Sequence, residues 1–385
     1  MNMKRFLCLL LISTLVLSCV SYAFAEATMP EISAPSAVLM EASTGRILYE
    51  KNSHEKLPPA SVTKVMTMLL VMEAIDKGQL SMQDTVRCSE VAASMGGSQV
   101  YLEPGEEMSV HDMLKAVAVA SGNDAAAALG EHLAGSLDAF VDRMNERAKE
   151  LGMQDTHFVN CNGLDAEGHL TSSHDIALMS RELISHSGIY EFTKIWMDSL
   201  RGGAFGLVNT NKLIRFYEGA TGLKTGSTGA AKYCLSATAN RNGMDLIAVI
   251  MGAETSQKRF NDAKSLLDFG FANYTLAKSL VSEEELGSMA VVKGKKSCVD
   301  LSVGGDYQML VSKPRAADIE KKLTVSECVE APVLKGEKLG EISFVLDGEE
   351  IGKADIVAKE DVLRMNPAEM LRKLAFQLFY GDSEA

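Results

Sequence analysis

The stretch 58-PPASVTKVMTMLLVMEAID-76 decides how the chain around it folds. Its two prolines interrupt the preceding segment, and the run 65–75 is long and apolar enough for a buried helix, which Gly78 ends. Ser61 and Lys64 stand at its start with i, i+3 spacing, so both side chains share one helical face. A lysine at the edge of an apolar run carries a charge that is costly to bury. This pair is therefore a candidate reactive site.

The chemistry open to this pair is proton transfer. The Lys64 amine can take the proton of the Ser61 hydroxyl if the neutral amine is populated near pH 7. Burial beside another cation lowers a lysine pKa in that direction, and the helix dipole favours negative charge developing at the serine. The spacing alone is a weak signal, because SHEK at 53–56 repeats it in a polar turn. Only Ser61 has prolines before it and an apolar run after it.

Two later tripeptides supply the groups that such a pair would need. The SGN tripeptide at 121–123 separates the helical stretches 113–120 and 125–133, and offers a second hydroxyl and a carboxamide. The KTG tripeptide at 224–226 precedes a strand-like hairpin. Its cation and hydroxyl suit a substrate carboxylate, and its glycine lets a substrate backbone lie close. Each tripeptide is common, but in this order, 60 and 103 residues apart, the three elements form a specific signature.

The chain from 26 to 275 has the pattern of one mixed α/β domain, because apolar helical stretches alternate with short strand-like runs. The runs 38–40 and 47–49 predict a hairpin. The runs 234–239 and 246–251 predict a second one, since an Asn-Gly pair, a strong two-strand hairpin signal, lies between them. A length of 385 residues with 46% apolar content agrees with two domains better than with one core.

The segment 276–362 has a different pattern. Its apolar residues alternate over short distances between turn residues, as in Ile342, Phe344 and Leu346 before an Asp-Gly turn. Alternation of this kind is typical of strands with one buried face. We therefore expect a small, sandwich-like β domain.

The last segment, 363–385, predicts an amphipathic helix of about four turns. Asn366 is a favoured N-cap, Pro367 suits the first turn, and Glu369 can reach back to the cap. An apolar stripe at 3- and 4-residue spacing follows, made of Leu371, Leu374, Ala375, Leu378 and Phe379, with Arg372, Lys373 and Gln377 off the stripe. Such a helix either docks on its own domain or rests on a membrane surface as a peripheral foot, and we favour the second.

Residues 1–25 have the pattern of a secretory signal, with two basic residues, an apolar run and an Ala-Phe-Ala cleavage site before Glu26. The apolar run is too short and too poorly flanked for a transmembrane helix. A lipid-attachment box ending at Cys19 is an alternative, but its leucine beside the small residue fits poorly. We expect an exported protein, at the outer face of the cytoplasmic membrane, in the cell wall or in the periplasmic space.

The charge excludes one class of partner. The formal net charge is -13, and it becomes -15 once Lys4 and Arg5 leave with the signal. Nucleic-acid binding needs clustered basic residues, which this balance does not supply. An acidic protein is also repelled by an anionic membrane, so attachment would depend on the apolar stripe and its local basic residues.

The cysteines suggest neither a disulfide framework nor a metal site. None has Cys-x-x-Cys spacing, and no histidine pair completes a zinc pattern, so no metal or other cofactor is expected. We expect buried thiols that act as small apolar side chains, with a bridge between Cys298 and Cys328 left open. After the signal is removed five remain: Cys88, Cys161, Cys234, Cys298 and Cys328.

In these motifs the sequence resembles the penicillin-interacting serine enzymes, and within them the low-molecular-mass D-alanyl-D-alanine carboxypeptidases of the peptidase S11 family. The likeness covers 35–275 well, and the β domain and terminal helix more loosely. It is carried by Pro59-Ala60-Ser61 with Thr63-Lys64, by 102–110 with Pro104-Gly105, by 121–125, by 162–165, by 209–212 and by 221–226.

The resemblance implies an α/β (α+β) catalytic domain of the β-lactamase and transpeptidase type, followed by a small all-β domain and a C-terminal amphipathic helix. In that family the β domain holds the enzyme at a distance from the membrane. The implied substrate is the peptidoglycan stem peptide with its D-Ala-D-Ala terminus, and β-lactam antibiotics are the implied covalent inhibitors.

The resemblance also implies a role for each motif residue in acyl transfer. Ser61, activated by Lys64, would attack the carbonyl of the penultimate D-alanine and release the terminal D-alanine, after which water hydrolyses the acyl-enzyme. Arg259 would assist in the site. The remaining implied roles are a proton relay for Ser121, orientation of Lys64 and of the substrate amide for Asn123, carboxylate binding for Lys224 and Thr225 beside Gly226, and an oxyanion hole formed by the backbone amides of Ser61 and Ser227.

Three other functions compete with this one. A class A β-lactamase shares the motifs, but it needs a Glu-x-x-Leu-Asn element that the segment 123–224 lacks, and it has no extra β domain. A non-catalytic cell-wall binding protein with a relic site is the second alternative. The third, a metallopeptidase built on His157, His169, His174 and Asp165, is weaker, because the last two histidines are five residues apart and do not share a helical face.

Overall fold

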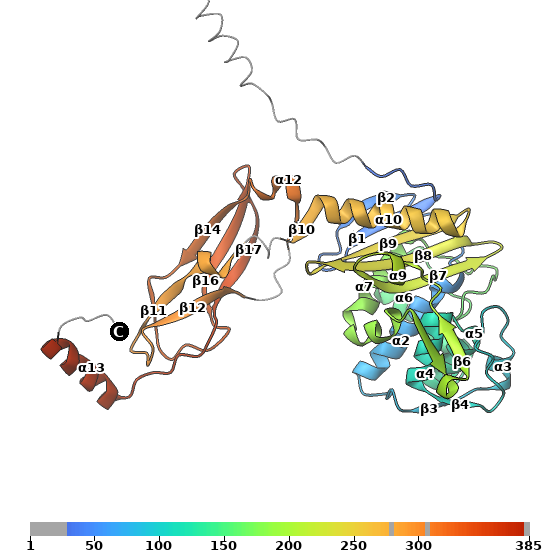
Figure 1. Cartoon of the computed structure of the whole chain (residues 1–385), viewed down its shortest axis with the longest axis horizontal. Helices are drawn as coiled ribbons and strands as arrows, with labels where there is room; N and C mark the ends of the chain where they lie inside the picture. Colours follow the sequence, from blue (N-terminus) through green and yellow to red (C-terminus); the bar gives the residue numbers. More distant parts are fainter. Residues whose placement is uncertain (1–28, 277–280, 305–308, 381–385) are drawn as a thin grey trace, which may run out of the picture.

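The computed structural model describes residues 29–276, 281–304 and 309–380. The predicted export signal at 1–25 lies outside the described residues. An α/β region and a narrower β region follow one another, and the last helix lies at the far end of the β region from the α/β region (Figure 1). The mixed α/β class with a following β domain is confirmed.

A five-stranded antiparallel sheet organises the α/β region, in the order β2-β1-β9-β8-β7. Both predicted hairpins are present, as β1 with β2 and as β8 with β9. The KTG tripeptide lies on β7, an edge strand of this sheet. The strands are β1 (Ser36–Glu41), β2 (Ile47–Lys51), β7 (Ala220–Thr228), β8 (Lys232–Arg241) and β9 (Met244–Ala253).

Helices cover both faces of this sheet, which explains why its central strands are apolar on both sides. Along β1, Val38 and Met40 belong to one core cluster, whereas Ala37 and Leu39 belong to another. On one face of the sheet, α7 packs on β1 and β9 and covers the first cluster, and α2 packs against α7. On the other face, α10 packs on β9 and covers the second cluster. These helices are α2 (Lys64–Asp76), α7 (Ser173–Ser185) and α10 (Ser256–Asn273).

The predicted core helix is α2. Ten of its thirteen residues are buried, so it is apolar all round rather than amphipathic, as expected for a helix surrounded by protein. It begins at Lys64, after a 3-10 turn at Ala60–Thr63, and its last residue is Asp76, shortly before Gly78.

The SGN tripeptide lies between two helices, as predicted. The first of them differs from expectation: it begins at Val110, because the Ser109 hydroxyl caps it, and its last turn, Ala116–Ala120, is a π-helix. π turns are frequent at functional sites.

The smaller elements around this region are α3 (Glu90–Ala93), α4 (Val110–Lys115), α5 (Asn123–Ala134), α6 (Leu137–Glu150), α8 (Tyr190–Thr193), α9 (Leu213–Phe216), β3 (Thr85–Arg87), β4 (Glu107–Ser109), β5 (Met197–Leu200), β6 (Phe205–Val208) and the 3-10 turns Ser187–Ile189 and Arg201–Gly203.

Six strands form the β region, in the order β14-β16-β17-β12-β11-β15. The strand β12 has a different partner along each half of its length. It pairs with β11 through Cys298–Asp300 and with β17 through Leu301–Val303. Strands that change partners in this way occur at the corners of sandwiches. A short pair, β10 with β13, connects the two regions. The elements are β10 (Tyr274–Leu276), α11 (Glu283–Leu286), β11 (Ser288–Val292), β12 (Cys298–Val303), β13 (Leu310–Ser312), α12 (Lys313–Ala316), β14 (Glu320–Val325), β15 (Cys328–Glu330), β16 (Lys338–Leu346) and β17 (Glu349–Ala358).

The expectation that all five cysteines are buried is wrong for two of them. Cys88, Cys161 and Cys234 are buried, whereas Cys298 and Cys328 are exposed, and all five are free thiols. The bridge that was left open is not formed. Both exposed cysteines pair with Ala290 of β11, from opposite sides, so two strand spacings, roughly 10 Å, separate them, more than a disulfide can span.

The terminal helix α13 (Pro367–Tyr380) begins as predicted. The Asn366 carboxamide accepts from the Glu369 backbone N–H, and the Glu369 carboxylate accepts from the Asn366 N–H, a reciprocal capping box. Its apolar stripe is not docked on the described protein, because Leu371, Leu378 and Phe379 are 72%, 84% and 82% exposed. Every helix in the described parts of the chain is too short or insufficiently apolar to cross a membrane.

Candidate active site

The turn before α2 presents Ser61. Ala60, immediately before it, is buried with φ +49°, a left-handed conformation that is unfavourable for an L-residue. Ser61 is half-buried, and Lys64, one turn further along, is completely buried. The Lys64 Nζ lies 3.0 Å from the Ser61 Oγ. The predicted face-sharing pair is therefore in direct contact.

The surroundings of the Lys64 amine suit its neutral form. Its Nζ lies 2.5 Å from the Asn123 Oδ1 and 2.6 Å from the Asn162 carbonyl, two oxygens that can only accept. A neutral amine has two N–H groups for these acceptors and one lone pair, which then faces Ser61. Burial lowers the pKa of Lys64 to about 7, despite opposing charges from Cys161 and Asp124.

The carboxamide of the SGN tripeptide contacts the Lys64 amine, as predicted. Asn123 begins α5 and directs its Oδ1 at Lys64, while its Nδ2 donates to the Gly96 carbonyl at 2.6 Å, which fixes the orientation of the amide. Ser121, two residues earlier, is buried with φ +64° at the end of the π turn. Its backbone is therefore strained at the junction between the π turn and α5.

The buried carboxylate next to the tripeptide has a structural task. Asp124 accepts backbone N–H groups of Val100, Leu102 and Ala125 at 3.0, 3.1 and 2.9 Å. No carboxylate among the described residues hydrogen-bonds to Ser61 or Lys64. Among the described residues, then, no glutamate bonds to the pair, in agreement with the missing sequence element of the class A β-lactamase alternative.

The KTG tripeptide places two polar side chains along β7. Lys224 is completely buried and donates to the Thr225 carbonyl at 2.9 Å, and the Thr225 hydroxyl donates to that of Thr210 at 2.7 Å. Burial, with the charges of Lys64 and Arg259, holds the pKa of Lys224 well below its ordinary value. The Lys224 amine and the Thr225 hydroxyl can both donate to an anionic group at the edge of the sheet, and the charge of that anion would favour the protonated lysine.

Gly226 has a second task that the sequence did not reveal. A Cβ atom there would lie 2.8 Å from the Ser61 N and 2.9 Å from the Pro59 carbonyl, so the glycine makes room for the protein's own turn. Gly163 approaches the same turn, where a Cβ atom would lie 1.9 Å from the Ala60 carbonyl. Edge strand and loop are therefore packed tightly around the residue that carries the hydroxyl.

Arg259 supports this edge strand. It extends from α10 and donates to the carbonyls of Gly226 and Cys234 at 3.0 and 3.1 Å. Burial lowers the pKa of Arg259 to about 10. The Arg259 guanidinium therefore brings a positive charge to the KTG strand and bonds directly to it.

Sequence reasoning missed two contributors to the site. Asn162 acts through its backbone carbonyl, which any residue could supply; the only sequence signal was the Asn-Gly turn at 162–163. His169 bonds to Thr63 at 2.8 Å. Thr63 belongs to the 3-10 turn Ala60–Thr63, called the nucleophile turn here because it carries the candidate nucleophile Ser61. No local pattern indicates that contact, because 106 residues separate the two in sequence.

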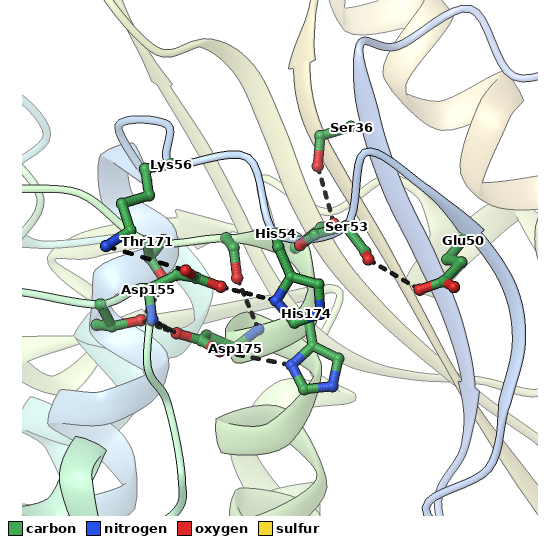
Figure 2. Close-up of polar contacts among 12 residues, drawn as sticks. Ser36, Glu50, Ser53, His54, Lys56, Asp155, Thr171, His174 and Asp175 are labelled. Atoms are coloured by element: carbon green, nitrogen blue, oxygen red, sulfur yellow. Dashed lines mark hydrogen bonds and ion pairs between the residues drawn. The ribbon is translucent and has the colours of Figure 1, made fainter.

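The metallopeptidase alternative is not supported, because its residues do not converge. His169 hydrogen-bonds to Thr63, and Asp165 accepts from the Thr228 hydroxyl. His174 stacks on His54, with ring centroids 4.6 Å apart. Figure 2 shows the two rings one above the other, with Asp155 beside the His54 ring and Asp175 beside the His174 ring.

One other cluster in the described chain has metal-ligand spacing, and it contains none of those residues. It consists of Glu73, Glu182 and His186. Arg147 already bonds both of its carboxylates, at 2.7 and 2.6 Å, and so supplies a positive charge there.

Comparison with known protein families gives two matches that follow each other along the chain. A profile of the peptidase S11 family, described as D-alanyl-D-alanine carboxypeptidase, matches residues 23–255. A profile described as the penicillin-binding protein 5 C-terminal domain matches residues 274–364.

Two curated relatives match over most of this chain and most of their own length. The D-alanyl-D-alanine carboxypeptidase DacF of Bacillus subtilis is 44% identical over 96% of this chain and 98% of its own length. DacC of Escherichia coli, with the same enzyme name, is 33% identical over 86% of this chain and 85% of its own length.

Of two similar solved structures, one covers most of this chain and the other covers a smaller part of it. Penicillin-binding protein 5 of Haemophilus influenzae is 31% identical, has a TM-score of 0.69, and corresponds to 88% of this chain and 99% of its own. Penicillin-binding protein D2 of Listeria monocytogenes, solved in an ampicillin-bound form, is 36% identical with a TM-score of 0.58, over 63% of this chain and 100% of its own.

Proposed function

Because this chain belongs to the peptidase S11 family of D-alanyl-D-alanine carboxypeptidases, we propose that it removes the terminal D-alanine from peptidoglycan stem pentapeptides through an acyl-enzyme on Ser61. The observation that carries this proposal is the buried Lys64 amine, 3.0 Å from the Ser61 hydroxyl, with its other two contacts made to acceptor oxygens. That geometry directs a lone pair at the hydroxyl proton.

The first step is attack on the carbonyl of the penultimate D-alanine. Lys64 takes the proton of Ser61 while the serine oxygen bonds to the carbonyl carbon. A pKa of about 7 leaves a large fraction of Lys64 neutral near neutral pH and still lets it return the proton. The same residue is thus matched to both halves of the transfer.

The negative charge that develops on the substrate oxygen needs donors. The backbone N–H groups of Ser61 and Ser227 are proposed for this task, each worth about 3 kcal/mol in comparable sites. Gly226 supports the pairing, because its Cα packs directly against the Ser61 amide. The strand β7 is also at the edge of its sheet, where an extended peptide could align beside it.

Collapse of the tetrahedral intermediate breaks the peptide bond and releases D-alanine as an amine, which must gain a proton. We assign the relay to Ser121, between Lys64 and the leaving nitrogen. Asn123 holds Lys64 in place and bonds the substrate amide, and Lys224 with Thr225 holds the terminal carboxylate. Water then attacks the ester, Lys64 again takes the proton, and Ser61 is regenerated.

β-Lactams are proposed to acylate the same serine. Their amide is part of a strained ring beside a carboxylate, so the groups that bind the D-Ala-D-Ala terminus also bind the drug. The ampicillin-bound form of the Listeria relative supports this proposal by similarity.

A carboxylate requirement tests the proposed activity. The mature chain should release free D-alanine from a peptide ending in D-Ala-D-Ala, whereas the same peptide with a C-terminal amide should be turned over at least 100-fold more slowly, because Lys224 and Thr225 lose their anionic partner. Enzymatic detection of D-alanine measures both rates. Absence of release from the free acid, or equal rates for the two peptides, would refute the proposal.

The exposed stripe of α13 is proposed to rest on the outer face of the cytoplasmic membrane, with the β region between it and the active site. The polar face carries Arg372 and Lys373, which suit anionic headgroups. The net charge of the mature chain opposes this contact, so the apolar stripe must supply most of the binding free energy.

Replacing Leu378 by glutamate should weaken binding to anionic vesicles by about 10-fold or more, because a buried leucine contributes about 1.5–3 kcal/mol. Lys373→Gln makes the same change in charge on the polar face and should cost less than threefold. Co-sedimentation with vesicles measures both, and D-alanine release should stay at the wild-type rate. Equal binding by wild type and Leu378→Glu would contradict the proposed membrane foot.

A further inference from the structure

A chain of hydrogen bonds connects His169 to the nucleophile turn. The His169 Nδ1 accepts the Val159 backbone N–H at 2.9 Å, so in the neutral ring the proton lies on Nε2. Nε2 lies 2.8 Å from the Thr63 Oγ1 and donates to it, and the Thr63 hydroxyl donates to the Ala60 carbonyl at 2.8 Å. Each donor has one acceptor, so the direction of the whole chain is determined.

The end of this chain is the peptide group that carries a proposed oxyanion donor. The carbonyl of Ala60 and the N–H of Ser61 belong to one planar peptide unit and point in opposite directions. Any rotation of the Ala60 carbonyl therefore turns the Ser61 N–H by the same angle. A bond that holds the carbonyl oxygen also aims the donor.

The orientation of this peptide group has to be fixed by its contacts. Ala60 has φ +49°, a left-handed conformation that is unfavourable for an alanine. Gly163 and Gly226 pack against the same unit with no space for a side chain. Contacts of this kind exclude volume but do not select a direction for the carbonyl, whereas the Thr63 hydroxyl does.

We propose that His169 is a positioning residue, which sets the orientation of the Ser61 N–H in the oxyanion hole through Thr63 and the Ala60 carbonyl. This inference rests on the proposed function, because it assigns a task within the same acyl transfer. His169 hydrogen-bonds to Thr63 and to the Val159 backbone, and not to the Ser61 hydroxyl, so its proposed effect is transmitted through Thr63.

The ring stays in the required form under working conditions. His169 is 2% exposed and packs against the ring of Phe158, with centroids 5.9 Å apart. Burial lowers the pKa of His169 to about 4, with His157 acting in the same direction and Asp165 against it. Above that pH the Nδ1 remains an acceptor for the Val159 N–H, and the donor stays directed at Thr63.

The experiment compares variants that break the chain with one that restores it. In His169→Leu and in Thr63→Val, kcat for D-alanine release should fall about 10- to 100-fold with KM within threefold, because an oxyanion donor acts mainly in the transition state. The double variant should be no slower than the slower single variant, since both substitutions break the same chain. His169→Gln, which offers an acceptor and a donor on one side chain, should recover most of the lost rate.

His157→Gln is the matched control, an exposed histidine of the same segment, and should keep wild-type kcat. Near-wild-type kcat in His169→Leu, additive losses in the double variant, or His169→Gln as slow as His169→Leu would overturn the inference. If His169→Leu fails to fold, as judged by thermal unfolding, the Thr63→Val and His169→Gln rates decide. A wild type with no Ser61-dependent turnover would instead refute the proposed function, so the two failures are distinguishable.

Discussion

Replacing Ser61 by alanine is expected to abolish covalent labelling by fluorescent penicillin and to lower the rate of D-alanine release about a million-fold, as seen when a nucleophilic serine is removed from other acyl-transfer sites. In the proposed mechanism the Ser61 oxygen bonds to the carbonyl carbon, so this substitution removes the nucleophile itself. Among the described residues, the Lys64 amine hydrogen-bonds to the Ser61 hydroxyl, to Asn123 and to Asn162, but not to Ser121.

The chain supplies a matched control for this variant. Ser53 stands in the other Ser-x-x-Lys sequence, but its hydroxyl donates to the Glu50 carboxylate at 2.8 Å, in the polar cluster of Figure 2. Ser53→Ala should therefore label at the wild-type rate. Labelling that persists in Ser61→Ala, measured on a denaturing gel after removal of free drug, would rule out Ser61 as the nucleophile.

Replacing Lys64 by methionine is expected to lower the acylation rate by about 10³- to 10⁵-fold, because a side chain of similar length remains but the proton acceptor is lost. In the wild type the rate should rise with pH and level off above about 7, where Lys64 becomes neutral. Stopped-flow measurement of penicillin acylation between pH 5 and pH 9 gives both results.

The control for Lys64→Met is Lys56→Met, which removes the lysine of the second Ser-x-x-Lys sequence. Lys56 is exposed and lies 3.9 Å from Asp155, so its loss should leave the profile unchanged. A wild-type profile that is flat across pH 7, or that falls as pH rises, would contradict the assignment of Lys64 as the base.

The same shift in pKa affects stability, in a direction that can be stated. The pKa of Lys64 is lowered in the folded chain from 10.5 to about 7, so between these pH values the unfolded chain binds a proton that the folded chain does not. The contribution of this group to stability therefore rises with pH through that window, and below it the cost of burying the charged form is fully present. A buried catalytic base reduces the stability of the fold near neutral pH.

Features with local causes were predicted correctly. The hairpins β1–β2 and β8–β9, the buried helix α2 and the capping box of α13 each arise from residues a few positions apart, through turn chemistry, apolar runs and reciprocal caps. The contact between Ser61 and Lys64 belongs to the same class, because a three-residue spacing near a helix start brings two side chains together whatever surrounds them.

Features that depend on long-range packing could not be predicted in this way. Asn162 contributes a carbonyl across 98 residues, and His169 reaches Thr63 across 106. Gly226 was predicted to leave room for the substrate backbone, and only the packing shows that its missing side chain also accommodates the turn that carries Ser61. Cys298 and Cys328 flank one strand because of sheet register, which their spacing does not encode.

The sequence by itself determined the order of the three motifs, the type of the main elements and a serine-lysine pair able to transfer a proton, because these depend on short-range spacing and on side-chain chemistry. Only the tertiary structure decided that Lys64 is completely buried, and hence that its amine is neutral enough to act as a base. Desolvation depends on every group packed around an atom, and those groups come from segments far apart in the chain. For the stretch around Ser61, local pattern therefore predicted the pair, and packing decided its protonation and the direction of the Ser61 N–H.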